Sequence, residues 1–185
     1  MLTWIVPLIA VALGLAIIVM FNRLVRARQM AREGWSGIDV QLKRRSDLIP
    51  NLVDSVKGYA AHERDVLTNV TEMRGVARAL PADAVAQRAA AEAALSAALG
   101  RLVATAEAYP DLKASGNFLK LQQQLSELES EIQMARRYYN GAVRNLNILV
   151  ESFPSNLIAG LFGFARMEFF ELDDVAARVA PKVSV

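Results

Sequence analysis

The chain has 185 residues, 54% of them apolar, and a formal net charge of +2. This length allows one domain with a real core, and the absence of cysteine excludes disulfides and thiolate metal sites. The single histidine, His62, cannot by itself support a histidine-rich metal site.

The first predicted element is an uncharged run from Leu2 to Phe21. Its length of about 20 residues, at about 1.5 Å per residue, matches the roughly 30 Å hydrocarbon core of a bilayer. We therefore predict a transmembrane anchor over residues 1–22. The alternative is a cleaved signal peptide, which needs a positive region before the apolar run and a small-residue cleavage site after it. Here only Met1 precedes the run, and the sequence that follows is "NRLVRARQMAR".

Positive charge gathers directly after this run, at Arg23, Arg26, Arg28 and Arg32. The positive-inside rule predicts that the N-terminus lies outside and the remainder in the cytoplasm. The same arginines suit anionic lipid headgroups, so membrane lipids are the first expected partner. A nucleic-acid interpretation is weaker, because no basic groove or groove-reading motif accompanies the charges. We expect no nucleic-acid partner.

Apolar residues then recur at steps of three and four from Ala31 to Leu80, which predicts a helical seam of heptad type. The seam keeps its phase across Pro50, so we favour a kinked continuous helix. A tight turn remains the alternative, because the residue before a proline resists the α conformation. Two polar residues, Arg45 and Glu63, occupy seam positions about 27 Å apart along such a helix. Each needs another partner, and we expect both to fix the register of packing.

The sequence "LPAD" at Leu80–Asp83 is a clear break, followed by an alanine-rich helix up to Tyr109. Pro110 and "DLKASGN" predict a loop. The next helix, from Phe118 to Phe153, has the most regular three-four pattern in the chain and is the natural partner of the earlier seam. Residues 23–150 are thus predicted to form a helical bundle.

Pro154 ends this helix, and "FPSNLIAGLFGFARMEFFELDD" follows with five of the seven phenylalanines. Its apolar run is too short to span a bilayer. One interpretation is that residues 151–185 fold back and close one end of the bundle. The other is that they contact the membrane or a neighbouring subunit. For that case the predicted interaction surface comprises Leu157, Ile158, Leu161, Phe162 and Phe164.

Motifs for catalysis are missing: the sequence has no phosphate loop, nucleophile elbow, zinc helix or paired metal-ligand motif. In "HERD", His62 and Glu63 are adjacent and point about 100° apart on a helix, so one site could hardly use both. The tyrosines and amide of "RRYYN", Arg136–Asn140, are better explained by interhelical hydrogen bonds than by a pocket. We expect no catalytic residues, no cofactor and no metal ligands, and hence no enzyme.

Three blocks carry a resemblance to a known family: "GWSGIDVQLKRRSDLIPNLVDSVKGYAAHE", "NFLKLQQQLSELESEIQMARRYYNGAVRNLN" and "FPSNLIAGLFGFARMEFFE". Together they resemble the LemA family of bacterial membrane proteins. The resemblance covers nearly the whole chain after the anchor and is weakest in the alanine-rich middle. It implies an all-α fold, with an N-terminal transmembrane helix followed by an antiparallel bundle built on a long helical hairpin. It implies no catalytic residues, because no catalytic function is established for the family.

Three classes of function stay open. We favour a non-enzymatic scaffold of the bacterial inner membrane that forms homo-oligomers and organises or shapes that membrane. The first alternative is a regulatory adaptor that docks an unidentified membrane or cytoplasmic protein. The second is a hydrolase with a site that the sequence does not reveal.

Overall fold

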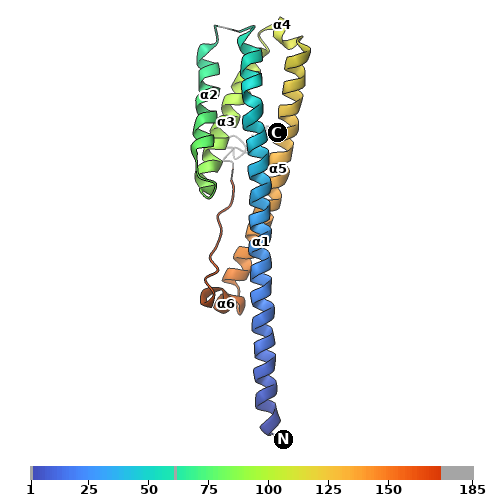
Figure 1. The fold of residues 1–185 in the computed structure, drawn as a ribbon, viewed down its shortest axis with the longest axis vertical. Helices are drawn as coiled ribbons and strands as arrows, with labels where there is room; N and C mark the ends of the chain where they lie inside the picture. Colours follow the sequence, from blue (N-terminus) through green and yellow to red (C-terminus); the bar gives the residue numbers. More distant parts are fainter. Residues whose placement is uncertain (1, 61, 172–185) are drawn as a thin grey trace, which may run out of the picture. The chain divides into compact units, whose positions relative to one another are not determined.

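The computed structural model describes residues 2–60 and 62–171, with side chains from Trp4 onward. All regular elements in this part of the chain are α-helices, as predicted (Figure 1). In chain order they are α1 (Leu2–Lys57), α2 (Arg64–Ala79), α3 (Val85–Ala106), α4 (Pro110–Lys113), α5 (Gly116–Glu151) and α6 (Ser155–Leu161). The all-α prediction with an N-terminal apolar helix is therefore confirmed.

The described residues form two compact units, and the long helices α1 and α5 contribute to both. The first unit contains the chain up to Ile38 and the segment Met134–Phe169. The second contains Asp39–Gln133 and Phe170. The segment boundaries expected after residues 22 and 150 stay predictions, and the tail from residue 172 lies outside the described residues.

The second unit buries an apolar core between five helical segments: residues 39–57 of α1, α2, α3, α4 and the first half of α5. The buried positions follow the three-four spacing read from the sequence, so each helix turns one apolar stripe inward. The break at "LPAD" lets α2 and α3 pack as a hairpin, since α2 ends at Ala79 and α3 begins at Val85. The core includes Ile49, Leu52 and Val56 from α1, Val70 from α2, Leu95 and Leu102 from α3, and Phe118, Leu121 and Leu125 from α5.

Pro50 lies inside α1, which continues for another two turns to Lys57. A proline has no N–H, so the carbonyl of Ser46, four residues earlier, loses its helical hydrogen bond. In this fold the Nε–H of Arg74 on α2 donates to that carbonyl at 2.7 Å. A side chain from the neighbouring helix thus replaces the bond that proline removes. The favoured interpretation of a continuous helix is correct.

We predicted that one helix carries the apolar seam unbroken from Ala31 to Leu80. This prediction is wrong, because α1 stops at Lys57 and α2 starts only at Arg64. Around Gly58 the backbone forms turn hydrogen bonds, including the N–H of Ala60 to the carbonyl of Val56 at 2.8 Å. The apolar spacing happens to stay in phase across this turn, so spacing alone could not reveal it.

The first unit packs α1 against α5 and α6. Leu24 and Ala27 of α1 share a core with Leu146 of α5 and with Ile158 and Ala159 of α6. In the same unit, Gly34 of α1 lies against Tyr138 of α5. Residue numbers therefore rise along α1 as they fall along α5, so the two long helices are antiparallel in the first unit. This confirms the predicted long helical hairpin.

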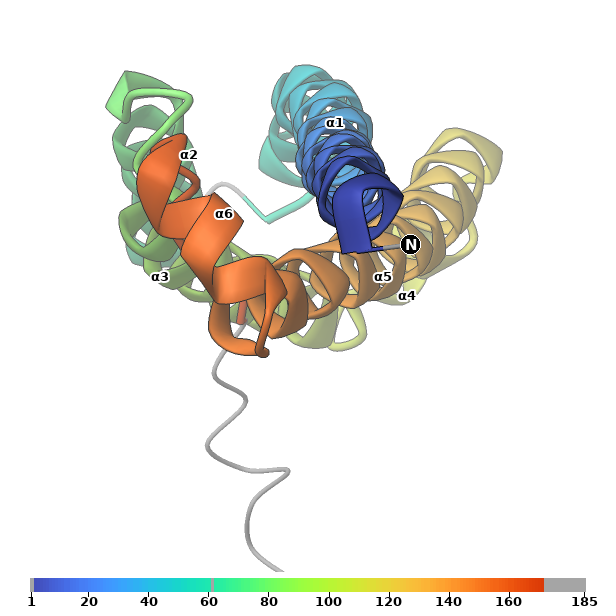
Figure 2. The same ribbon diagram turned by 90° about the horizontal axis from the view of Figure 1, so that it is seen from below.

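Glycine is favoured at position 34, where α1 lies against α5. A Cβ placed on Gly34 would lie 3.0 Å from the ring of Tyr138 and 3.0 Å from the Cα of Tyr139. Such distances are too short for a side chain unless a backbone moves. After α5 ends, α6 runs at an angle to it, as the view from below shows (Figure 2).

Candidate functional site

The N-terminal part of α1 presents an apolar surface to its surroundings. From Trp4 to Val19 every side chain is exposed, and Gly14 alone is partly covered. These turns extend past α6 in the first unit (Figure 1), and none of their apolar window is buried. Soluble proteins rarely leave such a continuous apolar patch in water. The segment is a candidate membrane span by both length and composition.

A second helix, α3, is also long and apolar enough to cross a membrane. In its case 44% of the apolar window is buried inside the second unit. Leu95, Leu99 and Leu102 of α3 contribute to the core there. The apolar character of α3 is thus explained by packing, whereas that of the first turns of α1 is not.

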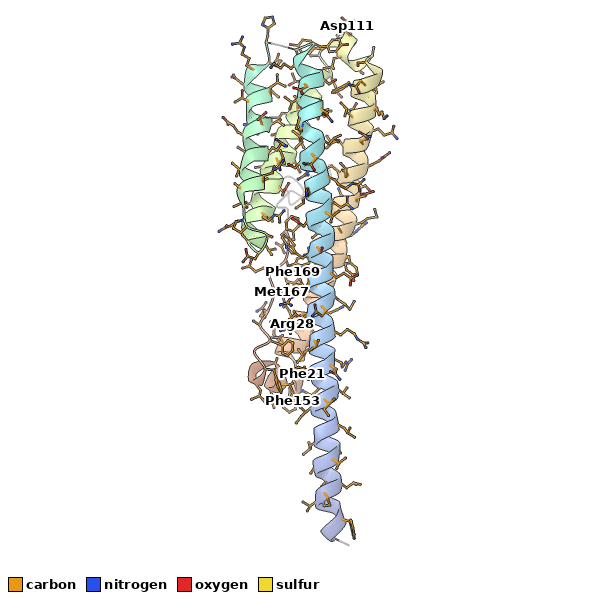
Figure 3. All side chains as sticks on the ribbon, viewed as in Figure 1. Phe21, Arg28, Asp111, Phe153, Met167 and Phe169 are labelled. Carbon is orange, nitrogen blue, oxygen red and sulfur yellow. The ribbon has the colours of Figure 1, made fainter. Side chains whose placement is uncertain are left out.

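The four arginines predicted to meet lipid headgroups do not share one environment. Arg23, Arg26 and Arg32 are exposed. Arg28 is partly buried, and its guanidinium carbon lies 4.5 Å from the centroid of the Phe164 ring. This cation–π distance favours attraction between the positive charge and the ring face. Figure 3 shows Arg28 and Phe21 on the side of α1 that bears these contacts.

The residues predicted as an interaction surface around α6 divide into two sets. Leu157, Leu161 and Phe162 are 62%, 76% and 49% exposed. Ile158 and Phe164 are buried, because they pack into the core of the first unit. The expectation that these two belong to the exposed surface is therefore incorrect for the chain by itself.

Phe153, which immediately precedes Pro154, is 79% exposed and adds to the exposed set. We call Phe153, Leu157, Leu161 and Phe162 the α6 apolar surface. One side of α6 closes the core of the first unit, as the first interpretation expected. The other side is exposed, and its contact with a membrane or a subunit stays a prediction.

Gly163 ends α6 and directs the chain back onto α1. Its φ is +68°, in the left-handed region that glycine adopts without strain. The N–H of Phe164 donates to the carbonyl of Ala159 at 2.9 Å, the six-to-one bond of a Schellman helix end. This turn places the Phe164 ring 5.8 Å from Phe21, and the Phe162 ring 4.9 Å from Phe21.

Beyond Gly163 the chain is extended and is held to α5 by side chains. The amide of Asn147 donates to the carbonyl of Met167 at 3.0 Å, while its oxygen accepts the N–H of Met167 at 2.9 Å. The hydroxyl of Tyr139 donates to the carbonyl of Glu168 at 2.8 Å. Burial, with the nearby Glu168 charge, raises the pKa of Tyr139 to about 12. The "RRYYN" cluster thus supplies a hydrogen bond within the fold, but this bond joins α5 to the extended segment and not to another helix as expected.

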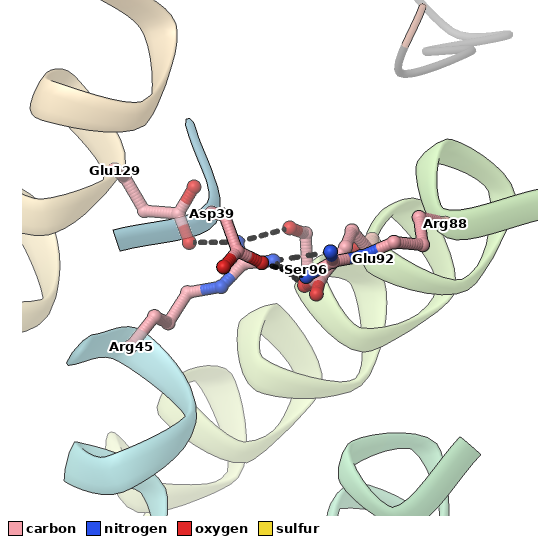
Figure 4. Close-up of polar contacts among 6 residues, drawn as sticks. All are labelled: Asp39, Arg45, Arg88, Glu92, Ser96 and Glu129. Carbon is pink, nitrogen blue, oxygen red and sulfur yellow. Dashed lines mark hydrogen bonds and ion pairs between the residues drawn. The ribbon is translucent and has the colours of Figure 1, made fainter. Parts of the chain in front are cut away.

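The strongest charge cluster lies in the second unit, around Arg45 (Figure 4). The side chain of Arg45 is fully buried and forms ion pairs with Glu92 of α3 and Glu129 of α5. It also donates to the hydroxyl of Ser96 at 2.8 Å. Both terminal nitrogens of the guanidinium are engaged, and its buried Nε–H has no acceptor among the described residues. One side chain therefore connects three helices.

A neighbouring ion pair joins Asp39 of α1 to Arg88 of α3 at 2.7 Å (Figure 4). Arg88, Glu92 and Ser96 follow one another at intervals of four residues, so they share one face of α3. Three polar residues at this spacing within an alanine-rich helix are the sequence signal for the site. The sequence reasoning treated that helix as featureless and missed it.

The Arg45 cluster is better suited to holding helices together than to chemistry. Its carboxylates are occupied by arginines, and a guanidinium does not give up its proton in proteins. The cleft beside it, lined by Asp39, Ser46 and Arg78 among others, measures about 170 Å³. Small-molecule sites are usually about 300–1,000 Å³. Nor do the described residues include a group of three His, Asp or Glu side chains placed to hold a metal ion.

Glu63, the second polar residue predicted on the seam, lies just before α2 rather than inside a helix. Its carboxylate accepts a hydrogen bond from the hydroxyl of Tyr109 at 3.0 Å. That bond, together with the carboxylate charge, raises the pKa of the Tyr109 hydroxyl. Glu63 does have a partner from another part of the chain, while a role in register stays a prediction. His62 beside it is exposed.

Comparison with known proteins decides the family. The model of the LemA family matches residues 34–185, most of the chain. The chain belongs to the LemA family. LemA-family relatives include the magnetosome protein MamQ 2 of Paramagnetospirillum magneticum, 26% identical over 186 residues that cover 87% of this chain and 68% of the relative. MamQ of Magnetospirillum gryphiswaldense is 24% identical over 86% of this chain and 68% of its own length.

Protein LemA of Metamycoplasma hominis is 26% identical over 154 residues, which cover 83% of this chain and 70% of that protein. LemA-family membership and the MamQ relatives suggest a membrane-associated, non-enzymatic protein. The exposed apolar turns of α1 are in keeping with this description.

Proposed function

We propose that this LemA-family protein is a non-enzymatic scaffold anchored in the bacterial inner membrane by α1, and that its helical bundle self-associates in the cytoplasm. The observation that carries the proposal is the uncovered apolar surface of α1 from Trp4 to Val19, which needs an apolar environment. The arginines that follow, at 23, 26 and 32, are exposed where headgroups would begin.

Self-association is supported by a second exposed strip, along α5 in the first unit. Met134, Tyr138 and Ile148 are about half exposed and follow the spacing of one helix face, with Gly141 between them. Apolar residues at this spacing on a helix surface are typical of helix–helix association. A second copy of the chain would cover the strip.

The test of self-association is the mass of the full chain in detergent, measured by size-exclusion chromatography with light scattering. A scaffold forms large homo-oligomers without any other protein. Met134→Glu places a charge on the strip and should reduce the assembly size, whereas Gln133→Glu, one position away and also exposed, should leave it unchanged. A monomer in every case would contradict the proposed scaffold.

Orientation is tested separately, because the chain has no cysteine of its own. Single cysteines at Thr3 and Gln87 report the two sides of the membrane. In cells whose outer membrane is permeabilised, an impermeant thiol reagent should label Thr3→Cys and not Gln87→Cys. The opposite pattern would reverse the topology.

A further inference from the structure

The end of α6 contacts α1, and this contact fixes its position along the axis of α1. If α1 enters the hydrocarbon near Leu2, about 20 residues at about 1.5 Å each bring Phe21 to the opposite boundary. The Phe162 ring lies 4.9 Å from the Phe21 ring, edge to face. Phe162 must therefore lie at nearly the same depth as Phe21, where acyl chains meet headgroups.

The uncovered side of α6 is apolar, although α6 is already packed. Ile158 and Ala159 bury one side of the helix in the core of the first unit. Leu157 and Leu161 lie one turn apart on the other side, and nothing in the described chain covers them. Packing within the chain thus explains the apolar residues on one side of α6 but not those on the other side.

The positive charges near the exposed side of α6 support lipid as the partner of this side. Arg23 and Arg26 are exposed within two turns after Phe21, at the level expected for phosphates. Arg28, whose guanidinium lies over the Phe164 ring, joins α1 to the chain that leaves α6. An apolar surface at the acyl boundary and guanidinium groups just beyond it match the two layers of an anionic membrane surface.

We propose that the α6 apolar surface inserts into the interface of the same bilayer that α1 crosses, as a second lipid contact of the chain. This inference rests on the proposed function, because the depth of Phe162 follows from the span. An interfacial helix buries its apolar side by about 5–10 Å in the headgroup–acyl boundary. α6 thereby acts as a short interfacial helix next to the anchor.

The test uses the full chain in phosphatidylcholine–phosphatidylglycerol vesicles whose lipids carry bromine in the upper half of the acyl chain, since bromine quenches nearby tryptophan. The chain has two tryptophans, Trp4 and Trp35. Both are changed to phenylalanine, and single reporters are introduced as Leu161→Trp or Leu157→Trp. The matched control is Arg137→Trp, an exposed position on α5 about 21 Å before the helix ends at Glu151.

Both α6 reporters are expected to lose about half or more of their fluorescence in brominated vesicles, while the control loses little. A further variant, Trp35→Phe with Trp4 kept, reports the span itself. Quenching of Trp4 without quenching at 157 or 161 overturns this inference and leaves the anchor intact. Absence of quenching at Trp4 would instead refute the anchor. Emission at 161 that is insensitive to both bromine and aqueous quenchers would assign the surface to a second copy and overturn lipid contact.

Discussion

Replacing Arg74 by methionine tests whether a neighbouring helix compensates for Pro50. The change keeps most of the aliphatic length and removes the donor that lies 2.7 Å from the carbonyl of Ser46. Hydrogen bonds to charged groups contribute about 1.5–3 kcal/mol. Because Arg74 is only partly buried, we expect the lower end, a loss of about 1.5 kcal/mol in the free energy of unfolding.

The second arm removes the proline. In Pro50→Ala the new N–H can donate to Ser46, which restores the helical bond and relieves the crowding that makes an internal proline cost about 3 kcal/mol. Pro50→Ala should therefore be stabilising. In this background Arg74→Met should cost no more than about 0.5 kcal/mol, so the two changes are coupled by about 1 kcal/mol.

The assay is urea unfolding of the full chain in detergent, followed by helical circular dichroism. The matched control is Arg78→Met, one turn further along α2. The guanidinium of Arg78 lies 3.7 Å from the Asp47 carboxylate, and both side chains are more than half exposed. That pair is worth at most about 1 kcal/mol. Equal costs of Arg74→Met with and without Pro50 would refute the reasoning.

Three further changes test the clusters described above. Arg45→Met leaves the buried Glu92 carboxylate without its partner and should cost about 3–5 kcal/mol in urea unfolding, most of it recovered by also changing Glu92→Met. Gly163→Ala puts a Cβ at φ +68° and should lower stability by about 1 kcal/mol, measured in the same way. The pKa of Tyr139 is raised from 10.0 to about 12 in the folded protein. The protonated hydroxyl of Tyr139 therefore contributes fully to the free energy of unfolding below about pH 10, and this contribution falls as pH rises toward 12. An ultraviolet titration should show a late tyrosinate near pH 12 that Tyr139→Phe abolishes, beside that of Tyr109, whose pKa is also raised; if Tyr139→Phe removes no late component, the hydroxyl of Tyr139 is not buried as described.

Sequence periodicity predicted the long hairpin because each apolar stripe is a local property of one helix. The pattern from Phe118 onward corresponds closely to α5, and the break at "LPAD" separates α2 from α3. Periodicity failed at Gly58, where a turn happened to preserve the phase of the stripe. Gly58 directly follows Lys57, and a glycine after a basic residue is a common signal for the end of a helix. At such a point this signal is better evidence for a helix end than a continuous apolar spacing is against it.

Partners of polar residues were harder to predict than their burial. Arg45 was expected to need an interhelical partner, but its position on the seam cannot say which helix supplies it. Glu92 and Glu129 are 47 and 84 residues away along the chain, so only tertiary packing brings them to Arg45. In the same way, the position of Phe164 inside the core depends on the turn at Gly163, which composition does not encode.

The hydrogen bonds of Asn147 and Tyr139 to the segment after α6 also affect how this segment could aggregate. Extended segments such as "FARMEFF" combine apolar and aromatic residues with backbone groups that could pair with another strand. Here the N–H and carbonyl of Met167 are both occupied by the Asn147 amide, and the carbonyl of Glu168 by the Tyr139 hydroxyl. A β-strand from another molecule would have to displace side chains anchored on a helix before it could add to this edge. Two helical side chains thus protect an aromatic, strand-prone segment from β-addition without any sheet being present.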